Sequence, residues 1–375
     1  MTTIGRLMQT AMYVGTALWA GMAAADEVKV AAILSSTGTY AFVGVPLING
    51  MRMADEELAA SGGYGPHTLS ISWDDNRSDR QEAITLLQRR VTSDMVDMVI
   101  GPISTAESMA AGPVAVELKV PLFTTAQSPD VLAIGDWIFK STETPDSYMV
   151  PVADYIADAL KPANCYLVSI QDNEGYVRQK NVFRDRLIER GVEITGDEAI
   201  LAADTDFTAL STKLADAEPE CLFVTAPPEQ AANIMIQALQ AGLSPDTIRA
   251  GDTGLGSANF LTAAGSAGEG VLFPATFVAT RSDETRAFTA AYQAKFGVAP
   301  DHWAATGYSM MAVLASALRS IEGDVTREKL RDAMAATNQV PVVLGGGTIT
   351  FDENRVPHFG GVVMRVQDGL WVEAK

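Results

Sequence analysis

Short apolar segments alternate with longer amphipathic segments along almost the whole chain. Residues 29–35 (KVAAILS) form a continuous apolar run, which is typical of a strand buried in a parallel sheet. In residues 44–61, apolar side chains such as Ile48 and Met51 recur about once per helical turn and predict an amphipathic helix. Repetition of this strand-and-helix unit predicts an α/β protein with parallel sheets.

The alternation of strands and helices starts again near the middle of the chain. The first series of expected strands continues at 68–75, 96–102, 120–126 and 136–142, and the second runs through 164–172, 192–200, 220–228 and 247–254. A chain of 375 residues is also longer than the roughly 250–300 residues that a single core usually holds. The two series therefore predict two Rossmann-like lobes.

The last third of the chain adds elements that follow neither series. A strand is expected at 270–277, and helices are expected at 284–297, 303–320 and 326–336. The tail, residues 345–372, has the pattern of a β-hairpin with turns at 352–354 and 368–369.

Residues 1–25 have the composition of a secretory signal peptide. They carry one charged side chain, Arg6, followed by an apolar stretch that ends near Met22. Ala23 and Ala25 fit the small-x-small cleavage rule, so we expect an exported mature chain that starts at Asp26. A membrane anchor is the alternative, but the stretch is short and interrupted compared with the roughly 20 residues of a spanning helix.

The composition narrows the choice of partners. The formal net charge is −19, whereas binding to nucleic acid requires a basic face. An anionic membrane surface is disfavoured for the same reason, and we attribute the acidity mainly to solubility.

Two cysteines, Cys165 and Cys221, each begin an apolar strand-like run. If these strands are neighbours in one parallel sheet, the two sulfur atoms lie at the same level, and an oxidising periplasm would allow a disulfide. A pair of buried free thiols is equally compatible with the sequence. The three histidines are scattered, so we expect no metal site.

The motifs of several common enzyme classes are missing. The sequence contains no G-x-x-x-x-G-K-[ST], no H-E-x-x-H and no G-x-S-x-G motif. The segment GDTGLG (251–256) lacks the third glycine of a dinucleotide-binding loop at the required spacing. We therefore expect no cofactor and no enzymatic activity.

Polar residues follow the expected strands, at the edge where open α/β sheets bind ligands. In the first lobe they include the hydroxyl residues Ser104, Thr105 and Ser128, which with the amino end of a helix would suit a carboxylate. The second lobe offers acidic residues, among them Asp252, which would suit an ammonium group. Together they fit an α-amino acid held between two lobes, although Ser and Thr before a helix are also ordinary N-caps.

Five segments, in order along the chain, resemble the periplasmic solute-binding proteins of ABC importers, specifically the branched-chain amino acid (Leu/Ile/Val) type I group. The segments are KVAAILSSTGTYAFVG (29–44), WDDNRSDRQEAITLLQRRV (73–91), VIGPISTAESMAA (99–111), VPLFTTAQSP (120–129) and ITFDENRVPHFGGVVMRVQDGLWV (349–372). The resemblance covers residues 27–375, almost the whole mature chain.

The resemblance implies a type I periplasmic binding protein fold, with two lobes joined by a three-segment hinge. We expect residues 26–143 plus 275–342 in the N-terminal lobe, and residues 144–274 plus 343–375 in the C-terminal lobe. The crossings are expected near 141–148, 272–276 and 341–347. The ligand would lie in the interlobe cleft, and hinge closure would bury it.

The resemblance also implies ligand contacts, position by position. Thr105, with Ser104 beside it, matches a residue that binds the ligand carboxylate, and Ser128 matches a hydroxyl that contacts both the carboxylate and the amine. The other matched positions are the ammonium acceptor Ala126, the closing aromatic Tyr176, the pocket aromatic Trp303, and the aromatics of the first loop, Tyr40 and Phe42.

Three positions depart from the family's pattern. The family's ammonium-binding acid falls on Asp252 or on Thr253, Gln127 is bulkier than usual, and a second-lobe tyrosine is replaced by Pro227 or Pro228. An Asp252 in the cleft favours an amine, whereas Thr253 favours a plain carboxylate or amide.

The implied function is that of the periplasmic substrate-binding subunit of an ABC importer. It would capture a small amino acid or a related small carboxylate and act, as a monomer, with permease subunits and their ATPases. The alternative is a ligand-sensing receptor lobe for amides, urea or aromatic acids.

Overall fold

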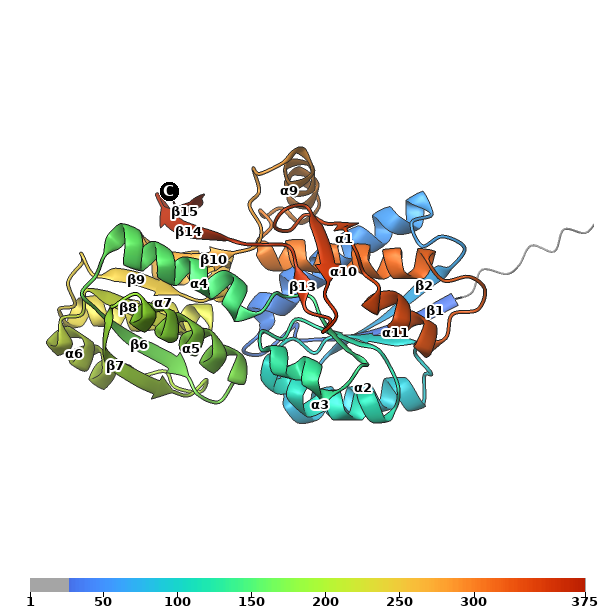
Figure 1. Cartoon of the computed structure of the whole chain (residues 1–375), viewed down its shortest axis with the longest axis horizontal. Coiled ribbons are helices and arrows are strands. Elements are labelled where there is room, and N and C mark those ends of the chain that lie inside the picture. Colours follow the sequence, from blue (N-terminus) through green and yellow to red (C-terminus); the bar gives the residue numbers. More distant parts are fainter. Residues whose placement is uncertain (1–26, 375) are drawn as a thin grey trace, which may run out of the picture.

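The structure is a computed structural model that describes residues 27–374. Two lobes lie side by side along the long axis of the molecule (Figure 1). The first contains a five-stranded sheet in the order β2-β1-β3-β4-β5, and the second contains a seven-stranded sheet in the order β15-β14-β10-β9-β8-β6-β7. The expectation of two α/β lobes with mostly parallel sheets is confirmed.

The first lobe takes its elements from two separate stretches of the chain. They are β1 (Glu27–Leu34), α1 (Ala41–Ser61), β2 (Thr68–Asp75), α2 (Arg80–Thr92), β3 (Met98–Ile100), α3 (Thr105–Glu117), β4 (Leu122–Thr124), the 3-10 turn η1 (Pro129–Ile134) and β5 (Ile138–Lys140), followed later by α9 (Asp283–Phe296), α10 (His302–Arg319) and α11 (Arg327–Ala335).

Alternate residues of β1 face opposite helical layers, as the two-residue period of a strand requires. Val30 and Ala32 pack in the cluster formed with α1 and α10, whereas Ala31 and Ile33 pack against α2 and α3. Burial on both faces explains why this strand is a continuous apolar run.

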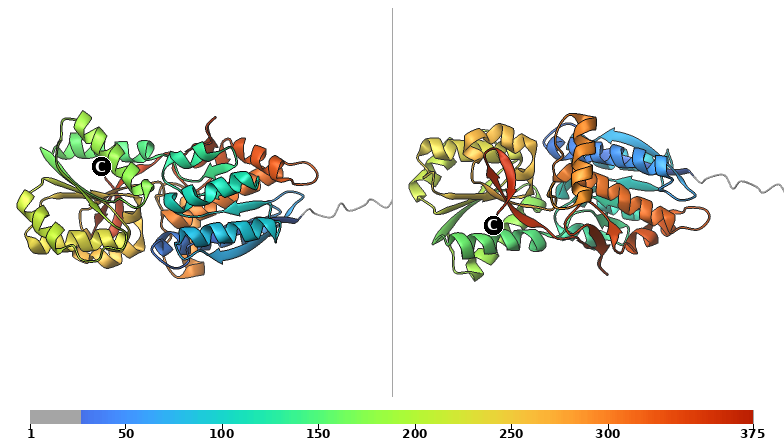
Figure 2. Two further views of the ribbon diagram at one scale, coloured as in Figure 1. Left: turned by 90° about the horizontal axis from the view of Figure 1, so that it is seen from below. Right: turned by 90° about the horizontal axis from the view of Figure 1, so that it is seen from above.

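The second lobe repeats this arrangement. Its elements are α4 (Pro145–Tyr155), the π-helical turn η2 (Ile156–Leu160), β6 (Asn164–Ile170), α5 (Glu174–Glu189), β7 (Glu193–Ile200), α6 (Thr208–Ala217), β8 (Cys221–Thr225), α7 (Pro228–Ala241), β9 (Ile248–Gly251), η3 (Thr253–Gly256), α8 (Ala258–Ala264), η4 (Gly265–Gly268), β10 (Leu272–Ala275), β14 (Val362–Gln367) and β15 (Leu370–Glu373). Helices cover both faces of its sheet (Figure 2).

The chain crosses between the lobes at three places. The first crossing joins β5 to α4 and the second joins β10 to α9. The third differs from the expected position at 341–347, because Val343, Leu344 and Phe359 belong to the hydrophobic cluster of the first lobe. The chain enters the second sheet only at Val362, so residues 343–359 pack with the first lobe and not with the C-terminal lobe.

The tail forms two hairpins in two different sheets, where the sequence predicted one. β11 (Val340–Pro341), β12 (Thr348–Phe351) and β13 (Pro357–His358) form a small antiparallel sheet against the first lobe. β14 and β15 form the second hairpin, which adds two antiparallel strands to the edge of the second sheet. Both expected turns exist, but the crossing between the lobes separates them.

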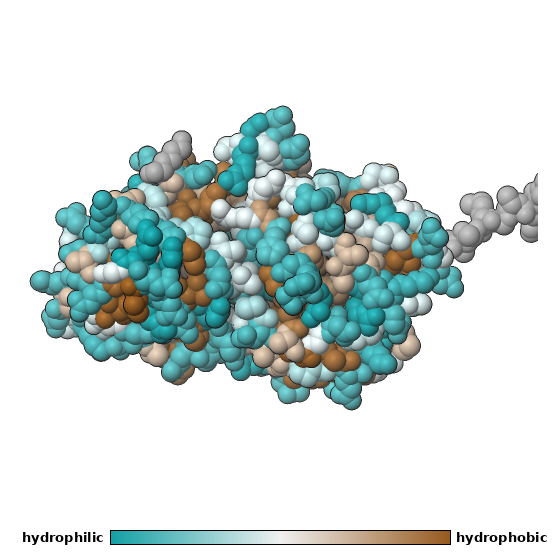
Figure 3. Space-filling view, in the orientation of Figure 1, coloured by the Kyte–Doolittle hydropathy of each residue, from teal (hydrophilic) through white to brown (hydrophobic). Residues whose placement is uncertain are grey.

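The face of the molecule in Figure 3 is mostly hydrophilic on both lobes, with separate hydrophobic areas. Within residues 27–374, no helix is long and apolar enough to cross a membrane. The expected signal peptide, residues 1–25, lies outside the described residues.

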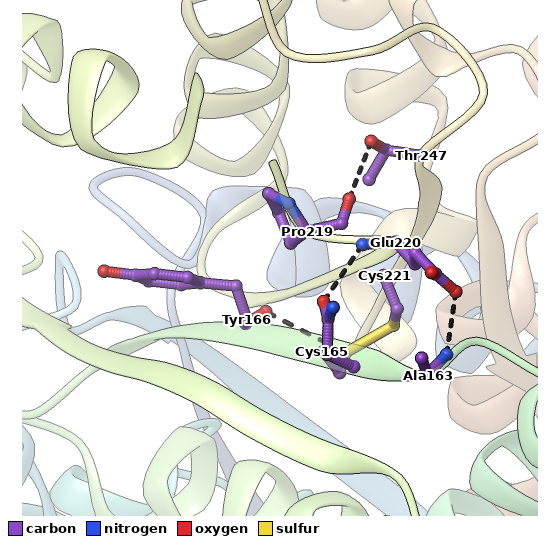
Figure 4. The surroundings of a disulfide bond; sticks show 8 residues. Ala163, Cys165, Tyr166, Pro219, Glu220, Cys221 and Thr247 are labelled. Carbon is purple, nitrogen blue, oxygen red and sulfur yellow. Dashed lines mark hydrogen bonds between the residues drawn. A yellow bond between two sulfur atoms is a disulfide. The ribbon is translucent and has the colours of Figure 1, made fainter. Parts of the chain in front are cut away.

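Cys165 and Cys221 are directly paired on the parallel strands β6 and β8, and the structure joins them in a disulfide (Figure 4). Both side chains are fully buried, in the cluster that β6 and β8 form with α4 and α5. Nearby, the Glu220 carboxylate accepts a hydrogen bond from the Ala163 amide at 2.7 Å. The disulfide therefore fixes the starts of two adjacent strands of the second sheet.

We predict that reducing this disulfide lowers the free energy of unfolding by about 2–4 kcal/mol, because the unfolded chain gains conformational freedom. The measurement is denaturant unfolding with and without dithiothreitol. A Cys165→Ala/Cys221→Ala variant is the control and should not respond to the reductant. Titration of two free thiols in the denatured, unreduced protein would contradict the assignment.

Candidate functional site

A cavity lies between the two lobes, at the carboxyl ends of strands from both sheets. Its volume is about 410 Å³, counted together with the solvent at its mouth. The residues that line it are Tyr40, Phe42, Val43, Ile103, Ser104, Thr105, Thr125, Gln127 and Trp303 from the first lobe, and Asn173, Gly175, Tyr176, Gln179, Asp252, Thr253 and Gly254 from the second. Nine of the eleven expected contact residues are among them.

Ser104 is the N-cap of α3. Its hydroxyl accepts a hydrogen bond from the Glu107 amide at 3.2 Å, and the Glu107 carboxylate accepts one from the Ser104 amide at 2.8 Å. Burial raises the pKa of Glu107, which also accepts a hydrogen bond from the Asn76 side chain at 2.7 Å. This capping box fixes the amino end of α3 at the cavity wall.

Thr105 is the first residue of α3, and its hydroxyl ties two loops together. The oxygen accepts hydrogen bonds from the backbone amides of Gln127 at 3.0 Å and Ser128 at 3.2 Å. Since a hydroxyl oxygen has two lone pairs, both acceptor positions are used. The Thr105 proton is therefore left to serve as a donor at the cavity.

Ala126 and Ser128 do not line the cavity. The Ser128 hydroxyl accepts from the Asp130 amide and donates to the Asp130 carboxylate at 2.9 Å, so it caps the turn η1. The Ala126 carbonyl accepts from the Thr142 hydroxyl at 2.7 Å. The Ser128 hydroxyl is thus engaged in local capping, and the ligand contact that the family resemblance implied at this position stays a prediction.

Gln127 reaches into the cavity and contacts the opposite lobe. Its side-chain oxygen accepts a hydrogen bond from the hydroxyl of Tyr148, on α4, at 2.7 Å. Its backbone carbonyl accepts from the ammonium of Lys140 at 2.8 Å. Lys140 is fully buried, and desolvation lowers its pKa to about 7.

Asp252 presents a buried carboxylate on the second-lobe side. One oxygen accepts from the Gly254 amide at 2.6 Å and the other from the Ala226 amide at 3.0 Å. Desolvation raises the pKa of Asp252 to about 7, although both hydrogen bonds oppose the shift. Thr253 follows at the start of η3 and lines the same cavity, so the structure brings both alternatives to the site.

The start of α5 carries Tyr176 and two lining residues that the sequence analysis missed, Gly175 and Gln179. Asn173 caps this helix by accepting from the Gly175 amide at 2.9 Å, and α5 begins at Glu174. An Asn followed by an acidic residue is a helix-start signal that was available in the sequence. The other lining residues outside the expected set are Val43, Ile103, Thr125, Asn173 and Gly254.

The two lobes contact each other around the cavity. The Asn173 amide donates a hydrogen bond to the hydroxyl of Tyr40 at 2.7 Å, and Arg80 donates to the Asp172 carbonyl at 2.5 Å. A Cβ atom added at Gly175 would lie 2.7 Å from the Thr105 hydroxyl oxygen, on the opposite wall. The structure therefore shows the lobes closed on one another.

Aromatic side chains complete the first-lobe wall. Tyr40 and Phe42 have ring centroids 6.5 Å apart, and Trp303 stands at the start of α10. Within the described residues, no group of three or more His, Cys, Asp and Glu side chains is arranged to hold a metal ion.

Comparison with known proteins places this architecture in a family. A curated relative is the leucine-, isoleucine-, valine-, threonine- and alanine-binding protein of Pseudomonas aeruginosa, 26% identical over 88% of this chain and 87% of its own. The leucine-binding protein LivK of Thermotoga maritima superposes with a TM-score of 0.85 at 24% identity and covers 93% of this chain and 98% of its own.

The isoleucine-bound LivJ of Streptococcus pneumoniae superposes with a TM-score of 0.84 at 23% identity, over 93% of this chain and 99% of its own. Such distant structural matches establish the fold. The family described as periplasmic binding protein matches residues 27–370, nearly all of the chain that the structure describes. The chain belongs to the periplasmic binding protein family.

Proposed function

We propose that this protein is the periplasmic substrate-binding subunit of an ABC importer and captures a small amino acid or a related small carboxylate. The observation that carries this proposal is one interlobe cavity with complementary walls. Thr105 supplies a hydroxyl donor on the first-lobe wall, and Asp252 supplies a buried carboxylate on the second. An α-amino acid carries the two matching groups.

The first-lobe wall suits the carboxylate of the ligand. Thr105 has a proton to donate, and it stands at the amino end of α3, where the helix dipole favours negative charge. Ser104 stands beside it and holds the amino end of the helix in place through the capping box with Glu107.

The second-lobe wall suits the ammonium group. A buried carboxylate retains acceptor positions after two backbone hydrogen bonds, and a bound cation offsets the cost of burying its charge. The names of the relatives, which bind leucine, isoleucine, valine, threonine or alanine, support an amino acid as cargo.

Delivery to the membrane requires no chemistry on the ligand. The three crossings act as a hinge, and a ligand that contacts both walls stabilises the closed form more than the open form. In this proposal the closed monomer then docks on permease subunits that are driven by their ATPases. Localisation in the periplasm agrees with the family and with the signal peptide expected at residues 1–25.

Thermal unfolding against a ligand panel tests the function directly. The panel contains amino acids, their analogues without the amino group, aromatic acids, amides and urea. We expect at least one small amino acid to raise the melting temperature, because a ligand that binds only the folded state stabilises it by mass action. A shift with the deaminated analogues or amides alone would refute an ammonium site at Asp252, and no shift with any compound would refute the transport proposal.

A substitution at Thr105 tests the carboxylate site. Thr105→Ala should weaken binding of the panel's best ligand by about 1–3 kcal/mol, because it leaves a buried carboxylate oxygen without its donor. Thr105→Ser keeps the hydroxyl and should restore most of the affinity, measured by titration calorimetry. Unchanged affinity in Thr105→Ala would remove Thr105 from the site.

A substitution at Gly175 tests closure. The Cβ of Gly175→Ala would meet the Thr105 oxygen of the opposite lobe, so the closed form should be disfavoured by about 1–3 kcal/mol. Ligand affinity should fall accordingly, and small-angle scattering should show a larger radius of gyration in the presence of ligand. The unfolding free energy without ligand is the control and should change little. Affinity and radius equal to those of the parent would contradict this closed arrangement.

A further inference from the structure

Two buried polar atoms at the cavity have no hydrogen-bond partner within residues 27–374. They are the indole nitrogen Nε1 of Trp303 and the side-chain oxygen Oε1 of Gln179. Trp303 is 4% exposed and Gln179 is 2% exposed, and both line the cavity. Neither atom takes part in the recognition of a carboxylate or an ammonium group proposed above.

Gln179 lies one turn into α5, and one end of its amide is already engaged. Its nitrogen Nε2 faces the Gly175 carbonyl of the same helix at 3.4 Å, which leaves Oε1 as the free end. An amide oxygen only accepts hydrogen bonds, so this atom requires a donor from another molecule.

Trp303 comes from the opposite lobe, at the start of α10. The cap of this helix, Asp301, accepts from the Ala304 amide at 2.9 Å, which fixes the position of the first turn. The indole nitrogen only donates hydrogen bonds, so it requires an acceptor.

Trp303 needs a hydrogen-bond acceptor and Gln179 needs a donor, and the two residues stand on opposite sides of the cleft. A neutral group that both donates and accepts, such as a carboxamide, offers the two kinds of hydrogen bond that these atoms lack. A branched apolar side chain would leave a donor and an acceptor buried without partners, which costs free energy at each atom.

We infer that the cargo carries a neutral hydrogen-bonding group, of the carboxamide class, on the part of the molecule that meets Trp303 and Gln179. This inference rests on the proposed function and narrows it, because it places an amide-bearing ligand above leucine, isoleucine and valine. Sites built to hydrogen-bond a polar group discriminate strongly against analogues that lack it.

Asparagine and leucine test the inference, since their side chains have nearly the same shape and differ in polarity. Titration calorimetry on the mature protein should give at least about tenfold tighter binding of asparagine. Gln179→Leu and Trp303→Phe should each reduce that preference about tenfold, because each weakens asparagine binding more than leucine binding. A merely structural defect would weaken both ligands together.

The chain provides matched controls. Gln237 and Trp371 also carry side-chain atoms without partners, but they do not line the cavity. Gln237→Leu and Trp371→Phe repeat the same chemical changes outside the site, so both should keep the parent's ratio of affinities.

The outcomes separate this inference from the proposed function. Leucine binding as tightly as asparagine would overturn the inference and keep the amino acid proposal. If neither amino acid binds, succinamate and 4-methylpentanoate repeat the comparison without the amino group. Preference for succinamate would then support the inference and end the amino acid proposal, and any other result with that pair would overturn the inference.

Discussion

The closed arrangement of the lobes depends on one close approach across the cleft, between Thr105 and Gly175. The Thr105 hydroxyl is held in place by two backbone amides of its own lobe, so it cannot yield to a side chain from the other side. Glycine at position 175 leaves that space open. Because α3 and α5 both begin there, the amino ends of two helices meet at the same cavity.

The cavity is also joined to the hinge through buried polar groups. Lys140 donates to the carbonyls of Gln127, in the cavity wall, and Glu143, in the first crossing. The Glu143 carboxylate in turn accepts from the amides of Phe359 and Gly360, at the third crossing, both at 2.8 Å. Displacement of Gln127 by a ligand would therefore act on two of the three segments that cross between the lobes.

Much of this architecture follows from the sequence, because buried strands leave a clear pattern of apolar residues along the chain. Strands covered on both faces are continuous apolar runs, and the loops after parallel strands meet at one edge, which locates the cavity. These two rules placed Ser104, Thr105 and Asp252 at the site.

The sequence could not place residues whose side chains can bond to, or pack against, more than one partner. Ser128 could bond to a ligand or cap a turn, and only the fold shows that the nearby Asp130 takes the hydroxyl. The third crossing shifts to the far side of Phe359, because Val343 and Leu344 find their apolar partners in the first lobe. Gln179 lies one helical turn beyond the expected contact at Tyr176, on the same helix α5.

The polar contacts across the cleft are well suited to reversible closure. The Tyr40–Asn173 and Gln127–Tyr148 hydrogen bonds each replace a hydrogen bond to water, so each contributes only about 1 kcal/mol net. Contacts of this size orient the lobes without locking them, whereas Gln179 and Trp303 keep buried polar atoms without a hydrogen-bond partner among the described residues. In the closed form these cavity atoms therefore lack stabilising hydrogen bonds, and a ligand that bonds to them supplies the missing stabilisation.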